Sequence, residues 1–345
     1  MFVYFLKSTF RYFFTFFFIL NFLNAEEIFD SKIEKLYLKN IRQLTYPSMG
    51  FEKAGEAYFS PDDQTIAFQA VPKGKTTYQI YKMNLEEQIP FLMSTGIGAC
   101  TCSFFHPFKN KMIFASSHSD PELSQECILS EQSTTKTGNY KWDLTPYMNI
   151  YEINLDGSGL TQLTSGAAYH AECAYSPDGS EIVFASNVSG SMHLYVMNSD
   201  GSDVKKITTI DHCYHGGPFF SPDGKRIIFR VDRDQVDYLQ IYLIDKDGSN
   251  EHQLTNNGAV NWAPYWHPNG KVVAFTTSIH GHRHYEIYLI NIETGVEYRL
   301  THHSGFDGLP VFSHDGKKIM WTSKRGEDGT CQIFIADFTM PPELE

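Results

Sequence analysis

Polar side chains recur at a fixed distance ahead of a turn that the chain repeats six times. Seven residues before the centre of each turn stand, in chain order, Ala54, Cys100, His170, His215, Asn261 and Asp307. Five residues before it stand Glu56, Cys102, Glu172, Gly217, Ala263 and Leu309. Converging imidazole and carboxylate groups can hold a divalent metal ion or a cationic amine. The candidate ligand-binding residues are therefore His170, Glu172, His215, Asn261, Asp307 and Glu56, and the candidate metal ligands are His170, His215 and Asp307.

Whether these side chains converge depends on the elements that carry them. Each set lies in a short aromatic segment typical of a β-strand, and alternate side chains of a strand point to the same side. Offsets of seven and five therefore predict one shared side for the two sets, at the mouth of a central channel if the strands form a ring. The same polar residues could instead satisfy the starts of the strands and hold channel water, without any ligand.

The unit around each turn has the composition of a four-stranded antiparallel sheet. The turn centres are Pro61, Pro107, Pro177, Pro222, Pro268 and His314, at steps of 46, 70, 45, 46 and 46 residues. After each turn comes an aliphatic segment that ends in Phe or Trp and then a segment around Ile-Tyr, Leu-Tyr or Ile-Phe. A short phrase of the type Gln-Leu-Thr follows in all units but the last, with residues 91–93 as a degenerate copy. Such segments favour strands. Six units of about 46 residues predict an all-β, six-bladed β-propeller.

The Gln-Leu-Thr phrase is displaced relative to the other strands. Its first copy, at residues 43–45, precedes any complete unit, and the last unit ends near Phe338 without a copy of its own. The N-terminal strand around Leu44 should therefore complete the last blade and close the ring. Asp-Gly pairs such as Asp200-Gly201 precede the phrase; hairpin chemistry accounts for them, although acidic turns can also bind calcium.

The sequence from Tyr169 to Asp203, with YSPDG at 175–179 and MNSDG at 197–201, resembles the TolB-type propeller repeat, also called PD40. The resemblance covers about residues 41–338 and implies a TolB-like six-bladed propeller. The family includes the Tol-system periplasmic protein, peptidases similar to prolyl oligopeptidase, and an oligogalacturonate lyase. The Tol protein has an α/β domain before its propeller, for which the short lead-in here leaves no room. The Gly-x-Ser-x-Gly motif of the peptidases is absent from the sequence.

The N-terminal residues have the pattern of an export signal. Lys7 and Arg11 precede an uncharged apolar run at residues 12–23, which ends at Asn24, Ala25 and Glu26. This predicts a signal peptide at residues 1–25, a lead-in at 26–40, the propeller at 41–338 and a tail at 339–345. An uncleaved anchor that also uses the first six residues is the alternative. We expect a periplasmic or secreted protein without a membrane span after cleavage.

The composition limits the classes of molecule that the protein is expected to bind. The formal net charge of -12 disfavours nucleic acid and anionic membrane surfaces and fits cations or basic protein patches. A hydrophobic content of 42% is sufficient for a large core. We expect a monomer that binds an envelope or secreted protein, a peptide or a glycan.

One step of 70 residues instead of 46 indicates an insertion of about 24 residues, at about 117–147 in the second blade. Long loops on rigid scaffolds often carry binding, although this one could also be inert. It contains Cys127, and exported chains can form disulfides, so Cys102 and Cys127 are a candidate pair, with Cys100 as the other possible partner. Nine of the 14 histidines, including those in the tract 280–284, are expected on the same face.

Two functions fit these features. The first is an exported binding or scaffold module, with no catalytic residues, that uses the histidine-rich channel face. The alternative is a metal-dependent carbohydrate-active enzyme resembling oligogalacturonate lyase, with a divalent metal ion at the channel mouth as its cofactor. That family's enzyme has seven blades and a dedicated metal cluster, so the count of six favours binding.

Overall fold

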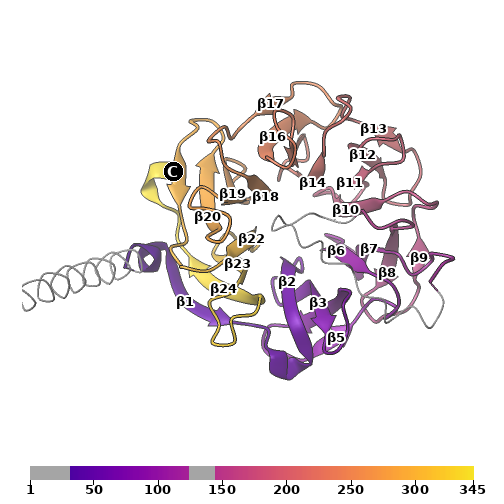
Figure 1. Cartoon of the computed structure of the whole chain (residues 1–345), viewed down its shortest axis with the longest axis horizontal. Helices are drawn as coiled ribbons and strands as arrows, with labels where there is room; N and C mark the ends of the chain where they lie inside the picture. Colours follow the sequence, from indigo (N-terminus) through magenta and orange to yellow (C-terminus); the bar gives the residue numbers. More distant parts are fainter. Residues whose placement is uncertain (1–31, 124–143) are drawn as a thin grey trace, which may run out of the picture.

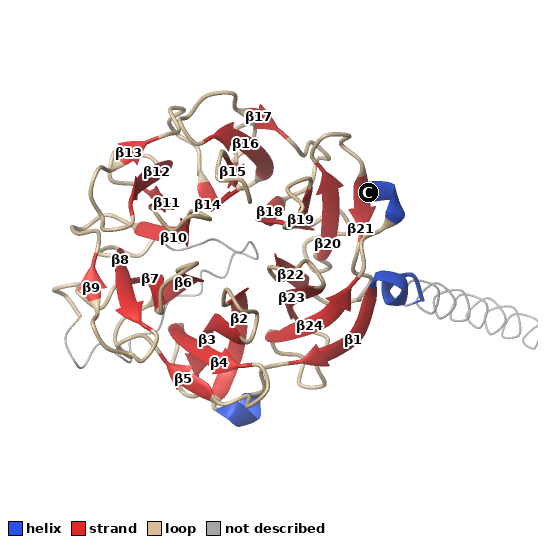
Figure 2. Cartoon of the chain, turned by 180° about the vertical axis from the view of Figure 1, so that it is seen from behind, coloured by secondary structure: helices blue, strands red, loops and turns tan. Residues whose placement is uncertain are grey.

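The computed structural model describes residues 32–123 and 144–345. Within these ranges the strands form six four-stranded antiparallel sheets, arranged as blades around one axis (Figure 1, Figure 2). The all-β, six-bladed propeller expected from the repeat is therefore confirmed. Among the described residues, no helix has the length and apolar character needed to cross a membrane.

Each blade has an inner, a second, a third and an outer strand. The inner strands are β2 (Phe51–Phe59), β6 (Cys100–Phe105), β10 (His170–Tyr175), β14 (Gly216–Phe220), β18 (Asn261–Trp266) and β22 (Asp307–Phe312). The second strands are β3 (Thr65–Pro72), β7 (Lys111–Ser116), β11 (Glu181–Ser186), β15 (Arg226–Val231), β19 (Val272–Thr277) and β23 (Lys318–Ser323). The third strands are β4 (Gln79–Asn84), β8 (Asn149–Asn154), β12 (His193–Asn198), β16 (Gln240–Asp245), β20 (Glu286–Asn291) and β24 (Gln332–Phe338). The outer strands are β5 (Pro90–Leu92), β9 (Thr161–Gln162), β13 (Lys205–Lys206), β17 (His252–Gln253), β21 (Glu297–Arg299) and β1 (Leu38–Gln43). Blades are numbered from β2, so blade 6 contains β22, β23, β24 and β1.

The N-terminal strand closes the ring, as the displaced phrase predicts. β1 pairs antiparallel with β24, from Leu38 opposite Phe338 to Gln43 opposite Phe334 (Figure 1). β1 begins three residues before the expected start at residue 41, and residues 32–37 ahead of it are helical. The chain ends in a 3-10 turn, η3 (Pro342–Leu344), whose Leu344 is buried. A second such turn, η1 (Pro47–Met49), joins β1 to β2.

The turn between the inner and second strands explains the recurrent Ser-Pro-Asp phrase. In blade 3, the Ser176 hydroxyl donates to Asp178 Oδ1 at 2.6 Å and accepts the Glu181 N–H at 3.0 Å. Blades 1, 4 and 6 repeat the Ser–Asp bond. In blade 2, His106 takes the place of this serine, and its Nδ1 accepts the Phe108 N–H at 3.1 Å. The Asp-Gly turns are satisfied internally too, since Asp200 Oδ1 accepts both the N–H and the hydroxyl of Ser202.

The Thr of the Gln-Leu-Thr phrase belongs to a buried motif that every blade repeats. In blade 4, the Thr255 hydroxyl donates to Gln240 Oε1 and accepts the Ile241 N–H, each at 2.9 Å. The residue at the Gln240 position is Gln or Asn in four blades, His193 in blade 3 and Glu286 in blade 5. A serine, Ser94, replaces the threonine in blade 1. The phrase is thus conserved between blades because its hydroxyl joins the third strand to the end of the outer one.

Large apolar side chains from the second strands fill the space between blades. The aromatic residue that ends each aliphatic segment is at most 1% exposed, namely Phe68, Phe114, Phe184, Phe229, Phe275 and Trp321. Burial of each such side chain contributes roughly 1.5–3 kcal/mol. These aromatic side chains and the repeated Ser and Thr hydrogen bonds therefore stabilise the framework. The residues of the inner strands can then vary from blade to blade.

Candidate functional site

Each inner strand contains a bulge at the residue five positions before the turn centre. That residue has a positive φ in all six blades, from 47° at Glu56 to 57° at Leu309. The register with the second strand shifts at the same point, for example between Ala171 and Ala174. A bulge interrupts the alternation of side chains along a strand. The expectation that offsets of seven and five share one side of the strand is therefore wrong.

The side chains seven positions before the turn centre lie in the seams of the framework. His170 Nδ1 lies 2.9 Å from Ser186 Oγ, and His215 Nδ1 donates to the Met192 carbonyl at 2.8 Å. The His215 ring also stacks on His193, with centroids 5.4 Å apart. Both histidines are at most 6% exposed, and burial lowers their pKa values, to about 4 for His215.

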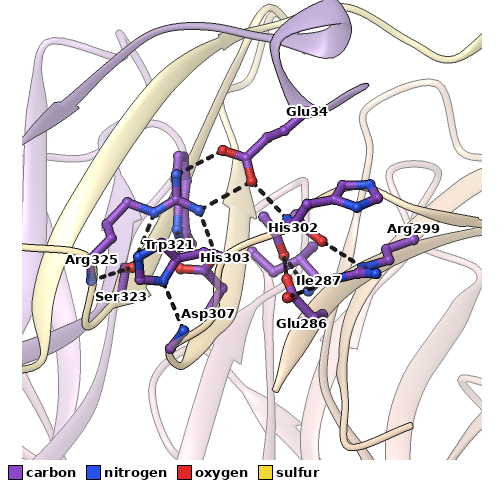
Figure 3. Close-up of polar contacts among 12 residues, drawn as sticks. Glu34, Glu286, Ile287, Arg299, His302, His303, Asp307, Trp321, Ser323 and Arg325 are labelled. Carbon is purple, nitrogen blue, oxygen red and sulfur yellow. Dashed lines mark hydrogen bonds and ion pairs between the residues drawn. The ribbon is translucent and has the colours of Figure 1, made fainter. Parts of the chain in front are cut away.

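The side chains of Asn261 and Asp307 are likewise hydrogen-bonded to neighbouring residues of the framework. Asn261 Nδ2 donates to Gln240 Oε1 at 2.9 Å. Asp307 accepts the Trp321 indole N–H at 3.0 Å and an Arg325 N–H at 2.5 Å (Figure 3). Within the part of the chain that the structure describes, no three His, Cys, Asp or Glu side chains are grouped to hold a metal ion. The structure thus does not bring His170, His215 and Asp307 together. A ligand role for the residues at this offset stays a prediction, beside the structural role that their contacts define.

Aromatic rings from opposite blades meet on the axis, two residues further along the inner strands than the bulge. They are Tyr58, Phe104, Phe219 and Tyr265, with ring centroids 5.1–6.1 Å apart. Since Tyr58 of blade 1 contacts Phe219 of blade 4, these rings close the axis at that level. Side chains at the bulge positions lie on the side of this aromatic layer where the inner strands begin.

Glu172 is the centre of a buried polar cluster at the bulge level. Its side chain is 4% exposed and accepts hydrogen bonds from the Tyr214 hydroxyl, the Gly217 N–H and Arg230 Nη2, the last at 2.8 Å. The Arg230 guanidinium carbon lies 5.6 Å from the Tyr214 ring centroid, and the Arg230 side chain is 13% exposed. One carboxylate thus joins blades 3 and 4 through an ion pair and a backbone donor.

Glu56 lies near this cluster but differs from Glu172 in its hydrogen-bond donor and in how readily it ionises. Its Oε1 accepts the Tyr58 hydroxyl at 3.2 Å. Burial raises the pKa of Glu56, and the negative charge of Glu172 raises it further, against the opposing effects of Cys102 and Arg230. Burial also holds the pKa of the Cys102 thiol well above its ordinary value. The site therefore combines an ion-paired carboxylate, a carboxyl group that ionises with difficulty, and a neutral thiol.

The fold does not require charge at these positions. The same bulge is built with Cys102, Gly217, Ala263 and Leu309 in the other four blades, each with a similar positive φ. Acidic residues on the axis are thus a property of blades 1 and 3 and not of the repeat. Chemically, Glu56 can donate a hydrogen bond as the acid or accept a cation as the carboxylate, so we take Glu56, Glu172 and Arg230 as the candidate binding site.

Counting residues back from the centre of each turn identifies part of this site. It selects Glu56 and Glu172, but it misses Arg230, which comes from the second strand. Eight residues after the turn centre the six blades have Gln69, Ala115, Ala185, Arg230, Thr276 and Thr322. A single cation at an otherwise uncharged position was the signal for Arg230, and a count along the second strands would have revealed it.

Two further expectations concern the cysteines and the histidine-rich loops. Cys102 carries a free, buried thiol, and its expected partner Cys127 lies outside the described residues, as does most of the insertion. In the tract 280–284, His280 Nε2 lies 2.8 Å from the Tyr288 hydroxyl and His284 Nδ1 donates to the Ser304 carbonyl at 2.7 Å. Ligand binding by this tract stays a prediction.

Known proteins resemble this chain in sequence and in fold. Residues 142–256 and 259–340 match the family model PD40, the TolB beta propeller domain. An uncharacterised protein of Agrobacterium fabrum is 35% identical over 115 residues, 31% of this chain and 38% of that protein. A TolB homologue of Chlorobaculum tepidum is 29% identical over 113 residues, 32% of this chain and 24% of its own. The matches thus span less than half the length of these relatives.

Solved structures agree on the architecture. A putative TolB from Agrobacterium tumefaciens superimposes with a TM-score of 0.57 at 18% identity, covering 83% of this chain and 91% of that one. An oligogalacturonate lyase in complex with manganese gives 0.54 at 18% identity, covering 84% and 77%. At such identities the likeness concerns the fold alone. The family model, however, matches more than half of the residues, and with six blades closed by β1 it identifies this chain as a member of the TolB β-propeller (PD40) family.

Proposed function

We propose that this protein is an exported binding module, periplasmic or secreted, that holds a protein, peptide or glycan ligand over the axis of the ring. The observation that carries the proposal is the polar cluster on the axis, in which Glu56 and Glu172 stand at bulges that the other four blades build without charge and Arg230 pairs with Glu172. Burying charged groups costs stability unless they are paired, so such groups tend to be kept where they serve a function. Export is supported by the signal-like pattern of residues 1–25.

The charge of the site and of the chain favours a ligand with a basic group. The formal net charge is -12, and Glu56 has the neutral hydroxyl of Tyr58 as its hydrogen-bond donor. An ammonium or guanidinium group placed at Glu56 would stabilise the carboxylate, because an opposite charge within about 4–6 Å favours the ionised form. Binding should then strengthen as the pH rises through the pKa of Glu56, which lies above its ordinary value of 4.5.

The test compares partners captured by the full chain in its native envelope. Wild-type protein and a Glu56→Gln variant are cross-linked in cells, and the captured proteins and glycans are identified by mass spectrometry. A Lys35→Ala variant, changed at an exposed residue away from the axis, is the matched control. We expect the wild type and the control to capture the same partner and the Glu56→Gln variant to lose most of it. Equal capture by all three would contradict a ligand at the axis.

The alternative, a metal-dependent carbohydrate-active enzyme, is supported by fold likeness only. Metal analysis of the purified protein, beside a variant with both His170 and His215 changed to Ala, decides whether it should be pursued. A stoichiometric divalent metal that the double variant loses would favour the enzyme. A wild-type protein without such a metal would reject it.

A further inference from the structure

The N-terminal segment is fastened to the ring by a buried carboxylate as well as by strand pairing. Residues 32–37 are helical and lead directly into β1. On one side of this helix, the Tyr37 ring packs edge-on against Tyr298 of β21, with centroids 5.2 Å apart. Glu34 is only 8% exposed and points away from solvent, toward Arg325 and His302 (Figure 3). We call residues 32–43 the closing strap.

Glu34 receives donors from two different blades. Its Oε1 accepts Arg325 Nη1 at 2.8 Å, and its Oε2 accepts the backbone N–H of His302 at 2.7 Å and Arg325 Nη2 at 3.4 Å. His302 follows β21 of blade 5, and Arg325 follows β23 of blade 6. A single carboxylate thus spans the seam between the blade that the strap completes and the blade before it.

Arg325 connects this contact to the innermost strand of blade 6. Its Nη2 also donates to Asp307 Oδ2 at 2.5 Å, and its Nε donates to Ser323 Oγ at 3.2 Å. Asp307 is the first residue of β22, and its other oxygen accepts the Trp321 indole N–H. The guanidinium carbon lies 5.0 Å from the Trp321 ring centroid. Arg325 is therefore held in one orientation, with Asp307 on one side and Glu34 on the other.

The pairing makes the position of the strap specific. A carboxylate as buried as Glu34 is stable only beside a cation or several donors. The Arg325 and His302 donors lie at a fixed place on the seam. β1 alone is an edge strand, six residues long, paired with β24 on one side. Strand pairing can slip in register, whereas the Glu34 contact is made at one position only.

We propose that Glu34, Arg325 and the His302 N–H form a latch that fixes the closing strap to the seam between blades 5 and 6, with Arg325 coupling the docked strap to Asp307 on the inner strand. Detachment of the strap is then a local opening, separate from unfolding of the ring. The ion pairs of the seam continue into blade 5, where Arg299 pairs with Glu286 near Asp307. This latch is independent of any ligand at the axis.

Amide hydrogen exchange of the full chain tests the latch. Glu34→Gln preserves the size of the side chain and removes its charge. We expect the amides of β1 to exchange about 10-fold faster than in the wild type, equivalent to about 1.4 kcal/mol of local stability. The amides of β22 should also lose protection, to a smaller degree, while β5, β9, β13 and β17 remain as in the wild type. Lys35→Ala, at an exposed residue of the same helix, should leave all of them unchanged.

Four outcomes would overturn the proposal or part of it. If β1 exchanges as in the wild type, Glu34 is no latch. If all six outer strands accelerate alike, the effect is a general loss of stability. If amide exchange becomes faster in β1 but not in β22, Arg325 does not couple docking of the strap to Asp307. A double variant with Glu34→Gln and Arg325→Met should accelerate β1 no more than the stronger single change, and effects that multiply would exclude direct pairing.

Discussion

Glu286 occupies a position where most other blades use a neutral amide, and its replacement gives a sharp prediction. It stands first in β20, as Gln79, Gln240 and Gln332 do in their third strands. The Glu286 side chain is 1% exposed and accepts the Thr301 hydroxyl at 2.5 Å and Arg299 Nη2 at 3.1 Å. Burial, together with the charge of Asp307, raises the pKa of Glu286 from 4.5 to about 8 despite these two donors.

The sign of the pH effect follows from the direction of this change. Because the folded state holds the Glu286 proton more tightly than the unfolded state, the associated stability is complete below pH 4.5 and is lost as the pH rises toward 8. Each pH unit in this window changes the free energy of unfolding by at most about 1.4 kcal/mol, which sets a ceiling of about 5 kcal/mol. Because the Arg299 guanidinium stabilises the ionised Glu286, we expect the measured change in the free energy of unfolding to be about 1–3 kcal/mol.

The Glu286→Gln variant should therefore match the wild type at pH 4 and exceed its stability by about 1–3 kcal/mol at pH 8.5. Chemical unfolding at both pH values measures the difference in stability between the variant and the wild type. Subtracting the difference at the lower pH from that at the higher pH removes any effect of the substitution that does not involve ionisation. The double variant with Glu286→Gln and Arg299→Gln reproduces the amides of blade 4, Gln240 and Gln253, and should be equally insensitive to pH. A Glu286→Gln variant that is less stable than the wild type by the same amount at both pH values would refute the reasoning, because the Arg299 ion pair would then dominate.

Three further predictions concern the axis and the framework. Arg230→Met leaves the buried Glu172 without its cation and should lower the free energy of unfolding by about 3–5 kcal/mol, and adding Glu172→Gln should recover part of this loss in chemical unfolding experiments. Thr255→Val removes two buried hydrogen bonds of blade 4 and should cost about 1–3 kcal/mol by the same measurement. Tyr58→Phe removes a donor that favours the charged carboxylate, so the pKa of Glu56 should rise further in a carboxyl NMR titration, and an unchanged or lower value would contradict the Tyr58 contact.

The fold was predictable because its repeated contacts demand particular residue types. Ser176 and Asp178 cap one turn through their side chains, and the Thr255 hydroxyl has a donor and an acceptor to satisfy, so these residues recur at the same spacing. The ring closure followed from the same regularity. The contact between Glu34 and Arg325 was not predictable, since it joins residues 291 positions apart and is made once.

The candidate site was only half predictable because the bulge leaves little trace in the sequence. A positive φ usually signals glycine, yet here the bulge position holds Glu56, Cys102, Glu172, Ala263 and Leu309, and glycine appears in blade 4 alone. The sequence therefore predicts simple alternation of side chains along the inner strands. It placed the histidines at offset seven beside the carboxylates at offset five, whereas the structure separates them.

The hydrogen bonds of the bulge N–H groups distinguish the roles of the two carboxyl groups. In blades 1 and 6, this N–H donates at 3.0 Å to a threonine of the preceding blade, from Glu56 to Thr322 and from Leu309 to Thr276. The residue equivalent to these threonines in blade 3 is Ala185, which has no hydroxyl, and the Glu172 carboxylate accepts the Gly217 N–H in its place.

Glu172 therefore has a structural task, because it replaces a missing hydroxyl acceptor and also pairs with Arg230. Glu56 is bonded differently: the N–H of its own bulge donates to the Thr322 hydroxyl, and its carboxyl group accepts the Tyr58 hydroxyl. A loss of binding in a Glu172 variant could thus arise from a distorted bulge between blades 3 and 4. Glu56 accepts neutral donors rather than the buried Arg230 ion pair, so a loss of binding in a Glu56 variant is the more direct test of the proposed function.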